Sequence, residues 1–121
     1  MNELGAVYEY IIPEIPPSNN KYIGRTNRWE YQATKKRWAD NIAVYCKPRP
    51  TSPIPQAVVK IKYYFADRRS RDPDNYSGKM LLDGLVRAGI LQDDSFANID
   101  LQLSAGYDKD LPRVVIEIEE V

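Results

Sequence analysis

Two pairs of aspartates have spacings that suit metal chemistry. Asp72 and Asp74 flank a proline where a predicted strand and its loop lead into a predicted helix. In extended backbone, a spacing of two residues puts both side chains on one face, with Cα atoms roughly 6–7 Å apart. Two carboxylates that close repel each other without a cation and can converge on one divalent ion. Asp93 and Asp94 follow the same helix, and the sequence alone does not show that they return to Asp72 and Asp74.

The composition narrows the chemistry. The chain has no histidine, which excludes Ser-His-Asp and Cys-His mechanisms and zinc sites built on imidazole. A metal would therefore be bound by oxygen ligands, which favours hard ions such as Mg²⁺ or Mn²⁺. The 17 Lys and Arg residues equal the 17 Asp and Glu residues in number. Net charge therefore gives no sign of an anionic partner, although a local basic patch matters more than the sum.

The length and the apolar pattern set the broad class. At 121 residues, we expect one domain spanning residues 1–121. No apolar run is long enough to span a bilayer, and the first residues lack the basic start and cleavage site of a secretion signal. Cys46 is the single cysteine, so no internal disulfide forms. We expect it to be a small buried residue in a reducing compartment.

The periodicity of the apolar residues predicts six elements. Alternation predicts four strands, and a helical spacing predicts two helices, with Gly89 as the cap of the second one. The turn from Asp108 to Pro112 predicts that the last two strands form an antiparallel hairpin. The order β-α-β-α-β-β predicts an α+β fold with two helices packed on one mixed sheet. The expected strands are 6–12, 58–65, 99–105 and 114–119, and the expected helices are 31–46 and 73–88.

The acidic residues also have ordinary structural explanations. Asp72 followed by Pro73 fits the N-cap and first residue of a helix without any catalysis. The segment Asp93-Asp94-Ser95 fits a solvated turn.

The same is true of the basic residues nearby. Lys79, Asp83 and Arg87 stand at i, i+4 and i+8, which fits a surface salt ladder. Arg68, Arg69 and Arg71 fit a solvated loop. Each signal is weak when it is taken alone.

Several of these motifs occur together and in a characteristic order. They are Asp67-Arg-Arg-Ser-Arg-Asp-Pro-Asp-Asn75, Lys79, Leu82-Asp83-Gly84-Leu85 and Ala88-Gly89-Ile-Leu-Gln-Asp-Asp94, preceded by Pro16-Pro-Ser-Asn-Asn-Lys-Tyr22. In this combination the chain resembles the RusA family of Holliday junction resolvases. The resemblance runs from Pro16 to Asp94, and separate motifs in one order are more specific than any single motif.

The resemblance implies a homodimeric, Mg²⁺-dependent endonuclease that nicks two opposing strands of a four-way DNA junction, with Mn²⁺ as a substitute ion. It implies that Asp72, Asp74 and Asp94 are catalytic metal ligands and that Lys79 is a catalytic lysine. It also implies a bacterial cytoplasm, for a host- or phage-encoded protein without a small-molecule cofactor or a membrane partner. Arg68, Arg69 and Arg71 precede the ligands, where backbone phosphates would have to lie, so we expect them to bind DNA.

Two alternatives stay open. One is a related nuclease for flaps, forks or other branched DNA, and the other is a DNA-binding module of the same fold that does not cleave. The intact acidic set with Lys79 argues against the second alternative. For the dimer, we expect the association surface to be either the tyrosine-rich first strand or the helix around Trp38, because they carry more large side chains than one small core needs.

Overall fold

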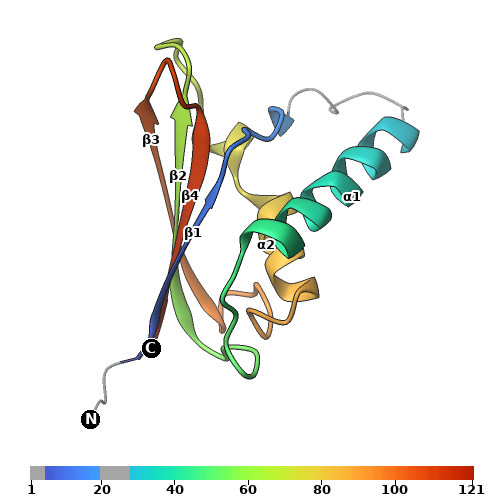
Figure 1. Cartoon of the computed structure of the whole chain (residues 1–121), viewed down its shortest axis with the longest axis vertical. Coiled ribbons are helices and arrows are strands. Elements are labelled where there is room, and N and C mark those ends of the chain that lie inside the picture. Colours follow the sequence, from blue (N-terminus) through green and yellow to red (C-terminus); the bar gives the residue numbers. More distant parts are fainter. Residues whose placement is uncertain (1–4, 20–27) are drawn as a thin grey trace.

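A computed structural model of the chain describes residues 5–19 and 28–121. The order of its elements confirms the predicted β-α-β-α-β-β arrangement, and the strand boundaries differ from the expected ones by at most two residues. A short 3₁₀ helix, η2, precedes the second helix. The elements are β1 Val7–Ile12, α1 Arg28–Tyr45, β2 Ala57–Phe65, η2 Pro73–Tyr76, α2 Lys79–Arg87, β3 Ile99–Tyr107 and β4 Arg113–Glu120 (Figure 1).

The four strands form one mixed sheet in the order β1-β4-β2-β3. The inner strand β2 pairs antiparallel with β4 and parallel with β3, and β1 pairs antiparallel with β4. The predicted hairpin between the last two strands is therefore wrong, because β2 lies between them. Alternation identifies a strand but not its neighbour, and consecutive strands are neighbours in only about two-thirds of cases.

The loop between β3 and β4 passes over the end of β2. The backbone N–H of Asp108 donates to the carbonyl of Phe65 at 2.8 Å, which ties this crossing to the last residue of β2. The Asp108 carboxylate accepts the N–H groups of Asp110 and Leu111, both at 3.1 Å, and the guanidinium of Arg113 at 2.9 Å. The strands on either side of β2 lie roughly 10 Å apart, and the loop between β3 and β4 is long enough to span that distance.

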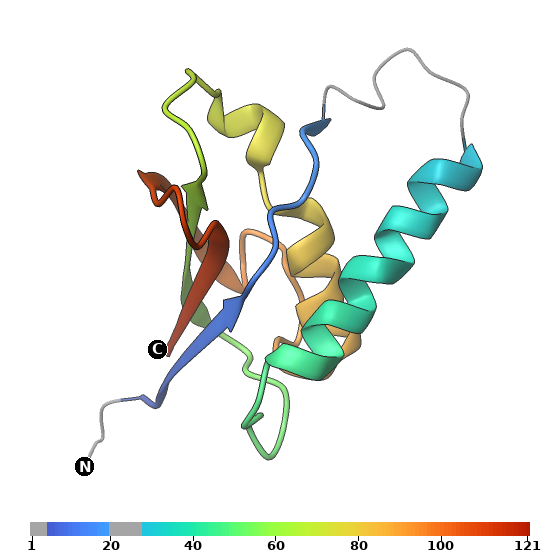
Figure 2. The same cartoon turned by 45° about the horizontal axis from the view of Figure 1, so that its top comes forward.

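Both helices pack on the same face of the sheet and enclose an apolar core (Figures 1 and 2). The buried strand residues are those that the alternation predicts. Cys46 is fully buried, as expected, and burial raises the pKa of its thiol to about 12. Within the described residues, no helix has the length and apolar character needed to cross a membrane. The buried side chains of β2 and β4 are Ala57, Val59, Ile61, Tyr63, Phe65, Val114, Ile116 and Ile118.

One large aromatic residue from each element of the expected association surface belongs to the core. Tyr10 of β1 and Trp38 of α1 are only 2% and 1% exposed. The hydroxyl of Tyr10 donates to the carbonyl of Pro48 at 2.7 Å. These two side chains therefore pack inside one chain. Val7 of β1 and Trp29 of α1 are exposed, and the choice of association surface stays a prediction.

The predicted helix from Pro73 to Ala88 is divided at Gly78. Gly78 has φ +81°, in the left-handed region, so the helical backbone restarts at Lys79. A Cβ on Gly78 would lie 2.8 Å from Cδ1 of Ile61, so a side chain there would force the buried side chain of Ile61 to shift. The apolar stripe of α2 is buried as predicted, so the periodicity alone did not reveal the break.

Replacing Gly78 with alanine should lower the free energy of unfolding by about 1–3 kcal/mol, because it adds left-handed strain and a clash with Ile61. Gly89 is the matched control, since it has φ +79° but a Cβ placed on it would meet no atom within 4 Å. Gly89→Ala should therefore cost only the left-handed strain, about 1 kcal/mol. Denaturant unfolding measures both values, and equal losses would show that Ile61 does not crowd position 78.

Candidate metal and DNA site

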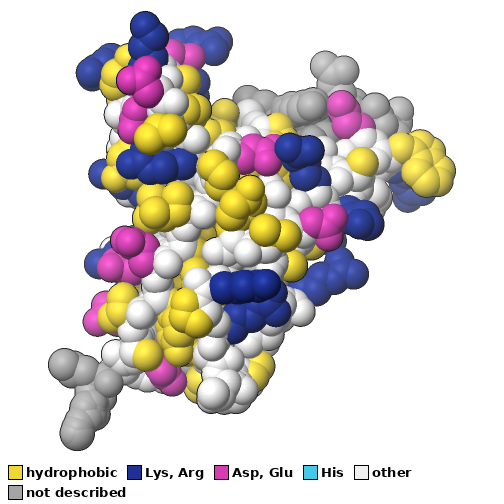
Figure 3. All heavy atoms as spheres, in the orientation of Figure 1, with side chains coloured by type: hydrophobic (Ala, Val, Ile, Leu, Met, Phe, Trp, Pro, Cys, Tyr) yellow, Lys and Arg dark blue, Asp and Glu magenta, His cyan; other side chains and the backbone are white. Residues whose placement is uncertain are grey.

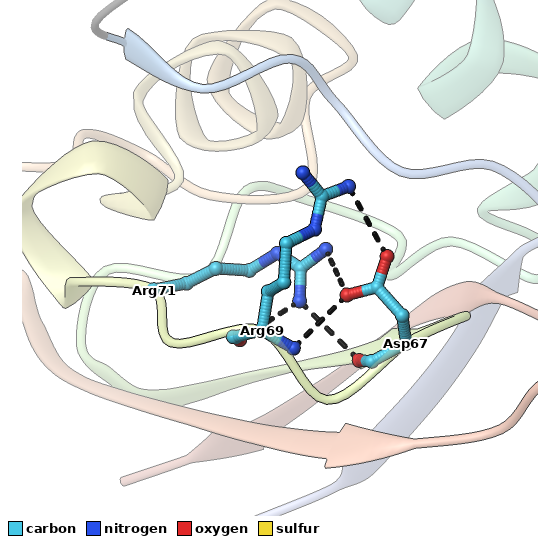
Figure 4. Close-up of polar contacts among 3 residues, drawn as sticks. All are labelled: Asp67, Arg69 and Arg71. Atoms are coloured by element: carbon cyan, nitrogen blue, oxygen red, sulfur yellow. Dashed lines mark hydrogen bonds and ion pairs between the residues drawn. The ribbon is translucent and has the colours of Figure 1, made fainter.

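The loop after β2, residues 66–72, is organised by Asp67 (Figure 4). The backbone N–H and the guanidinium of Arg69 donate to its two carboxylate oxygens at 3.0 and 3.2 Å. The guanidinium of Arg71 lies 2.9 Å from Oδ1 of Asp67 and donates to the carbonyl of Arg69 at 3.1 Å. Asp67 has no evident role in the sequence alone, although an aspartate that accepts the N–H two residues later is a common feature of turns.

These contacts lower the pKa of Asp67 to about 2. The largest cause is the hydrogen bond from the backbone N–H of Arg69, followed by the one from its guanidinium. The pKa of Asp67 in the folded protein lies below the ordinary pKa of an aspartate. These contacts therefore stabilise the loop at pH values above that ordinary pKa. This stabilisation is lost as the pH falls through about 2. The turn is therefore intact at neutral pH.

The three arginines that we expect to bind DNA differ in how they are held. Arg71 is only 19% exposed, and its guanidinium lies 4.0 Å from the ring centroid of Phe65. Arg68 lies 4.2 Å from the ring centroid of Tyr107, and the side chain of Arg69 is 82% exposed. Stacking on an aromatic ring keeps the positive charge but fixes the plane of the guanidinium. Arg68 and Arg69 therefore offer accessible charge, whereas Arg71 mainly supports the loop.

Asp72 and Asp74 lie at the exit of this loop, and both are exposed. Asp72 is extended, but Asp74 lies inside η2, so the spacing argument for one shared face does not apply. The carboxylate of Asp72 makes no capping hydrogen bond, and only its backbone carbonyl accepts the N–H of Asn75, at 3.0 Å. The N-cap explanation therefore leaves this carboxylate unexplained. Within the described residues, neither carboxylate has a hydrogen bond or an ion pair.

Asn19 connects the N-terminal motif to this site. Its side-chain amide donates to the carbonyl of Asp74 at 3.0 Å and to the hydroxyl of Ser77 at 3.1 Å. Pro16 and Pro17 line a small cavity together with Lys79 and the backbone beside it. The rest of the motif, residues 20–22, lies outside the described residues. The role of Asn19 is not visible in the sequence, because its two partners lie more than 50 residues later in the chain.

Lys79 is the first residue of α2 and lies next to these aspartates in the chain. Its ammonium group is 3.7 Å from Oδ2 of Asp83, which confirms one step of the expected salt ladder. No ion pair joins Asp83 to Arg87 in the described part of the chain, so the second step is absent. An exposed pair of this length is worth little, so Lys79 is available to a phosphate.

The loop that carries Asp94 is fixed to the start of β2. The backbone N–H of Gln92 donates to the carbonyl of Ile54 at 2.9 Å, and the side chain of Asn98 donates to the carbonyl of Pro55 at 2.9 Å. The carboxylate of Asp93 accepts the N–H of Asp94 at 2.9 Å, so Asp93 serves the turn itself.

Asp94 and Asp72 consequently lie toward opposite ends of the sheet. The loop of Asp72 leaves the end of β2, a strand roughly 26 Å long, whereas the loop of Asp94 adjoins its start. Figures 1 and 2 both show α2 between these two loops. Among the described residues, no three acidic or cysteine side chains gather at one point. In one chain, Asp72, Asp74 and Lys79 therefore follow each other from the loop exit through η2 to the start of α2, and Asp94 lies toward the other end of the sheet.

Replacing both Arg69 and Arg71 with glutamine should move the pKa of Asp67 back toward its ordinary value, because the guanidinium hydrogen bonds are lost. The return should be partial, since the backbone N–H of residue 69 remains a donor. NMR titration of the aspartate side chains measures this pKa. Arg37→Gln is the control, because Arg37 bonds Glu14 at 2.8 Å and should leave Asp67 unchanged. An ordinary pKa for Asp67 in the unmodified protein would contradict the described turn.

The chain matches the family model "Endodeoxyribonuclease RusA" over residues 13–119, which includes β2, the loop with Asp67, both acidic segments and the closing strands. A search of curated proteins gave no match. Because the family model spans nearly the whole chain, the protein belongs to the RusA family of endodeoxyribonucleases, which are hydrolases that act on DNA.

Proposed function

We propose that this protein is a homodimeric, Mg²⁺-dependent endonuclease that resolves Holliday junctions by paired cuts in the bacterial cytoplasm. The observation that carries the proposal is the pair of carboxylates of Asp72 and Asp74. Both are exposed and lack partners in the described structure, although the loop before them is firmly tied. A preorganised metal site requires ligand side chains that are free to bind the ion and a loop that is itself held in place by other contacts.

The donor set suits a hard cation. Asp72 and Asp74 offer only carboxylate oxygen, and the chain has no histidine to attract softer metals. When Mg²⁺ or Mn²⁺ is bound, it supplies a polarised phosphate and an activated water for hydrolysis. Asp94 is the third proposed ligand, and it would have to approach from outside this chain's own site.

Lys79 and the loop arginines would bind the DNA around this site. The side chain of Lys79 is 65% exposed, and its ammonium group can offset charge on the phosphate as a point cation. Arg68 and Arg69 present accessible guanidinium groups just before the ligands. Arg71 contributes by holding the loop against Phe65 and Asp67.

Among the described residues, basic and acidic side chains are distributed unevenly over the elements. This distribution supports a DNA partner, although the net charge of the chain is zero. The helices α1 and α2 and the connection between residues 46 and 56 carry eight Lys or Arg against three Asp or Glu. The strands carry three Lys or Arg against five Asp or Glu. Figure 3 shows basic side chains over the helical side and another group over the loop after β2. Such a segregated surface attracts phosphates locally.

A groove between α1 and α2 holds part of this positive charge. One open hollow of about 700 Å³ contains Lys36, Arg49 and Arg87, with Asp40 as its acidic residue. It shares Arg87 with a smaller hollow that also contains Lys35. Lys35 and Arg87 make no ion pair within the described residues. The groove runs along α2 away from Lys79, so a strand leaving the site could follow it.

The junction itself supports a two-fold assembly. Resolution requires cuts in two opposing strands, and two equivalent sites related by a C2 axis match the approximate symmetry of the junction. A panel of four-way, flap, fork and linear substrates distinguishes this proposal from a nuclease for other branched DNA.

Cleavage of a labelled four-way junction should require Mg²⁺ or Mn²⁺ and stop with chelator. Asp74→Asn should slow cleavage by at least about 10²-fold, because it removes the charge of a proposed ligand, with little change in unfolding free energy. Asp110→Asn, at an exposed aspartate in the loop over β2, is the matched control and should cleave normally. Undiminished cleavage after thorough chelation, or by Asp74→Asn, would refute the mechanism.

The double variant Lys35→Gln/Arg87→Gln should bind the junction more weakly when cleavage is blocked by chelator. The slope of log affinity against log salt should fall by roughly one unit per lost phosphate contact. Lys60→Gln/Lys109→Gln removes the same charge from the outer sheet face and the loop over β2, and should change the slope less. Equal slopes in the two double variants would remove the groove from the DNA interface.

A further inference from the structure

The helix α2 begins without a side-chain cap. Its N-cap residue is Gly78, and among the described residues no side chain bonds the first N–H groups of the helix. A capping side chain would normally supply an oxygen atom to these groups. A larger residue at the N-cap is disfavoured, because its Cβ would lie 2.8 Å from Cδ1 of Ile61. The N–H groups of residues 79–81 are therefore left for an acceptor from outside the described structure.

A buried hydroxyl without a partner lies at the same place. Tyr63 of β2 is only 2% exposed, and its hydroxyl makes no hydrogen bond in the described structure. The hydroxyl oxygen lies 3.5 Å from the position that a Cβ on Gly78 would occupy, so it is at the start of α2. Burial raises the pKa of Tyr63, which keeps the hydroxyl protonated and able to donate. A buried hydroxyl that loses water without gaining a bond is costly and rare in native proteins.

The hydroxyl and the free N–H groups line one small cavity of about 20 Å³. Its lining includes Tyr63, Gly78 and the first three residues of α2. This volume suits a single oxygen atom, since one water needs roughly 10–15 Å³ on the same measure. Lys79 lines the cavity and has a side chain that is 65% exposed, so the cavity reaches the surface beside a positive charge. None of the described residues that line it is acidic.

The charges around the cavity favour an anion. The N-terminus of a helix carries a partial positive charge, and its free N–H groups are directed at the position of a bound anion. The ammonium group of Lys79 adds a full charge, because its exposed pair with Asp83 at 3.7 Å is weak. Asn19 also lines the cavity and donates to the carbonyl of Asp74 at 3.0 Å. An anion in the cavity would therefore lie next to the segment that carries a proposed metal ligand.

From these observations we infer that the start of α2 binds one phosphate group of the DNA backbone, held by the Tyr63 hydroxyl and the first N–H groups of the helix. The inference rests on the proposed function, because the DNA substrate is the source of the phosphate. One phosphate oxygen enters the cavity and accepts hydrogen bonds from these donors, while Lys79 offsets the charge at the edge. Such a contact positions the strand beside Asp74 without reading its sequence.

Amide NMR tests the site without any cleavage. In the presence of chelator, inorganic phosphate should shift the amide signals of residues 79–81 until they saturate, and a short single-stranded oligonucleotide should shift the same signals. Tyr63→Phe should weaken phosphate binding at least about tenfold, because it removes a hydrogen bond to a charged group. Tyr64→Phe is the matched control, since the ring of Tyr64 packs with Lys62 and Arg113. This control should bind phosphate as the unmodified protein does.

Two results of the titrations would overturn the inference. The first is an absence of shifts at residues 79–81, or an affinity for phosphate that is the same in Tyr63→Phe and in the unmodified protein. The second is a shift with inorganic phosphate but none with the oligonucleotide, which would remove the DNA backbone as the source of the phosphate.

Unfolding by denaturant in phosphate-free buffer tests whether the hydroxyl lacks a permanent partner. Tyr63→Phe should not lower the denaturant midpoint, because no hydrogen bond is lost. Tyr10→Phe is the comparison and should lower the midpoint, because the hydroxyl of Tyr10 donates to the carbonyl of Pro48 at 2.7 Å. An equal loss in the two variants would show that a bound water already satisfies Tyr63, and it would overturn the inference.

The outcomes separate this inference from the proposed function. A protein that binds phosphate and the oligonucleotide at residues 79–81 but cleaves no DNA with Mg²⁺ would refute the endonuclease while leaving the phosphate site intact. A protein that cleaves the junction but shows no shift at these residues would refute the phosphate site alone.

Discussion

The placement of β2 between β3 and β4 determines where every functional segment lies. Because β2 runs parallel to β3, the loop that leaves β2 and the loop that enters β3 are at opposite ends of the sheet. The first of these loops carries Asp72 and Asp74, and the second carries Asp94. The short helix α2 only joins the two ends, so it cannot bring their carboxylates together. The separation of the acidic residues is therefore a direct consequence of strand order.

Much of the fold followed from local patterns in the sequence. The alternation in segments such as Val59 to Phe65 identified the strands and their buried faces, because a side-chain period of two is a local property. Strand partners depend on contacts between distant segments, and so the pattern of β3 and β4 suggested a hairpin that does not form. The break at Gly78 was likewise hidden, since it depends on the position of Ile61 in another element.

The sequence proposed the residues of the candidate site but not how the chain supports them. Asp72, Asp74 and Lys79 were proposed from their types and from the order of the motifs, and in the structure they occupy the loop exit, η2 and the start of α2. The residues that hold the site in place, Asn19 and Asp67, were missed. The partners of Asn19 are distant in the chain, and the main partner of Asp67 is a backbone N–H group. Asn19 contacts residues more than 50 positions later, and the role of Asp67 depends on the conformation of the turn. The distribution of charge was also hidden, because a neutral total says nothing about which face carries the arginines.

The pairing of β1 with β4 has a consequence for how the chain acquires its structure. Val7 is opposite Glu119, so the first strand of the sheet finds its partner only in the last. During synthesis on a ribosome, β1 must wait until β4 has emerged, and its pairing closes a very long loop. β2, α2 and β3 can associate earlier, because they are closer in sequence. We therefore expect β1 to join last and to be the first strand to detach when the protein opens.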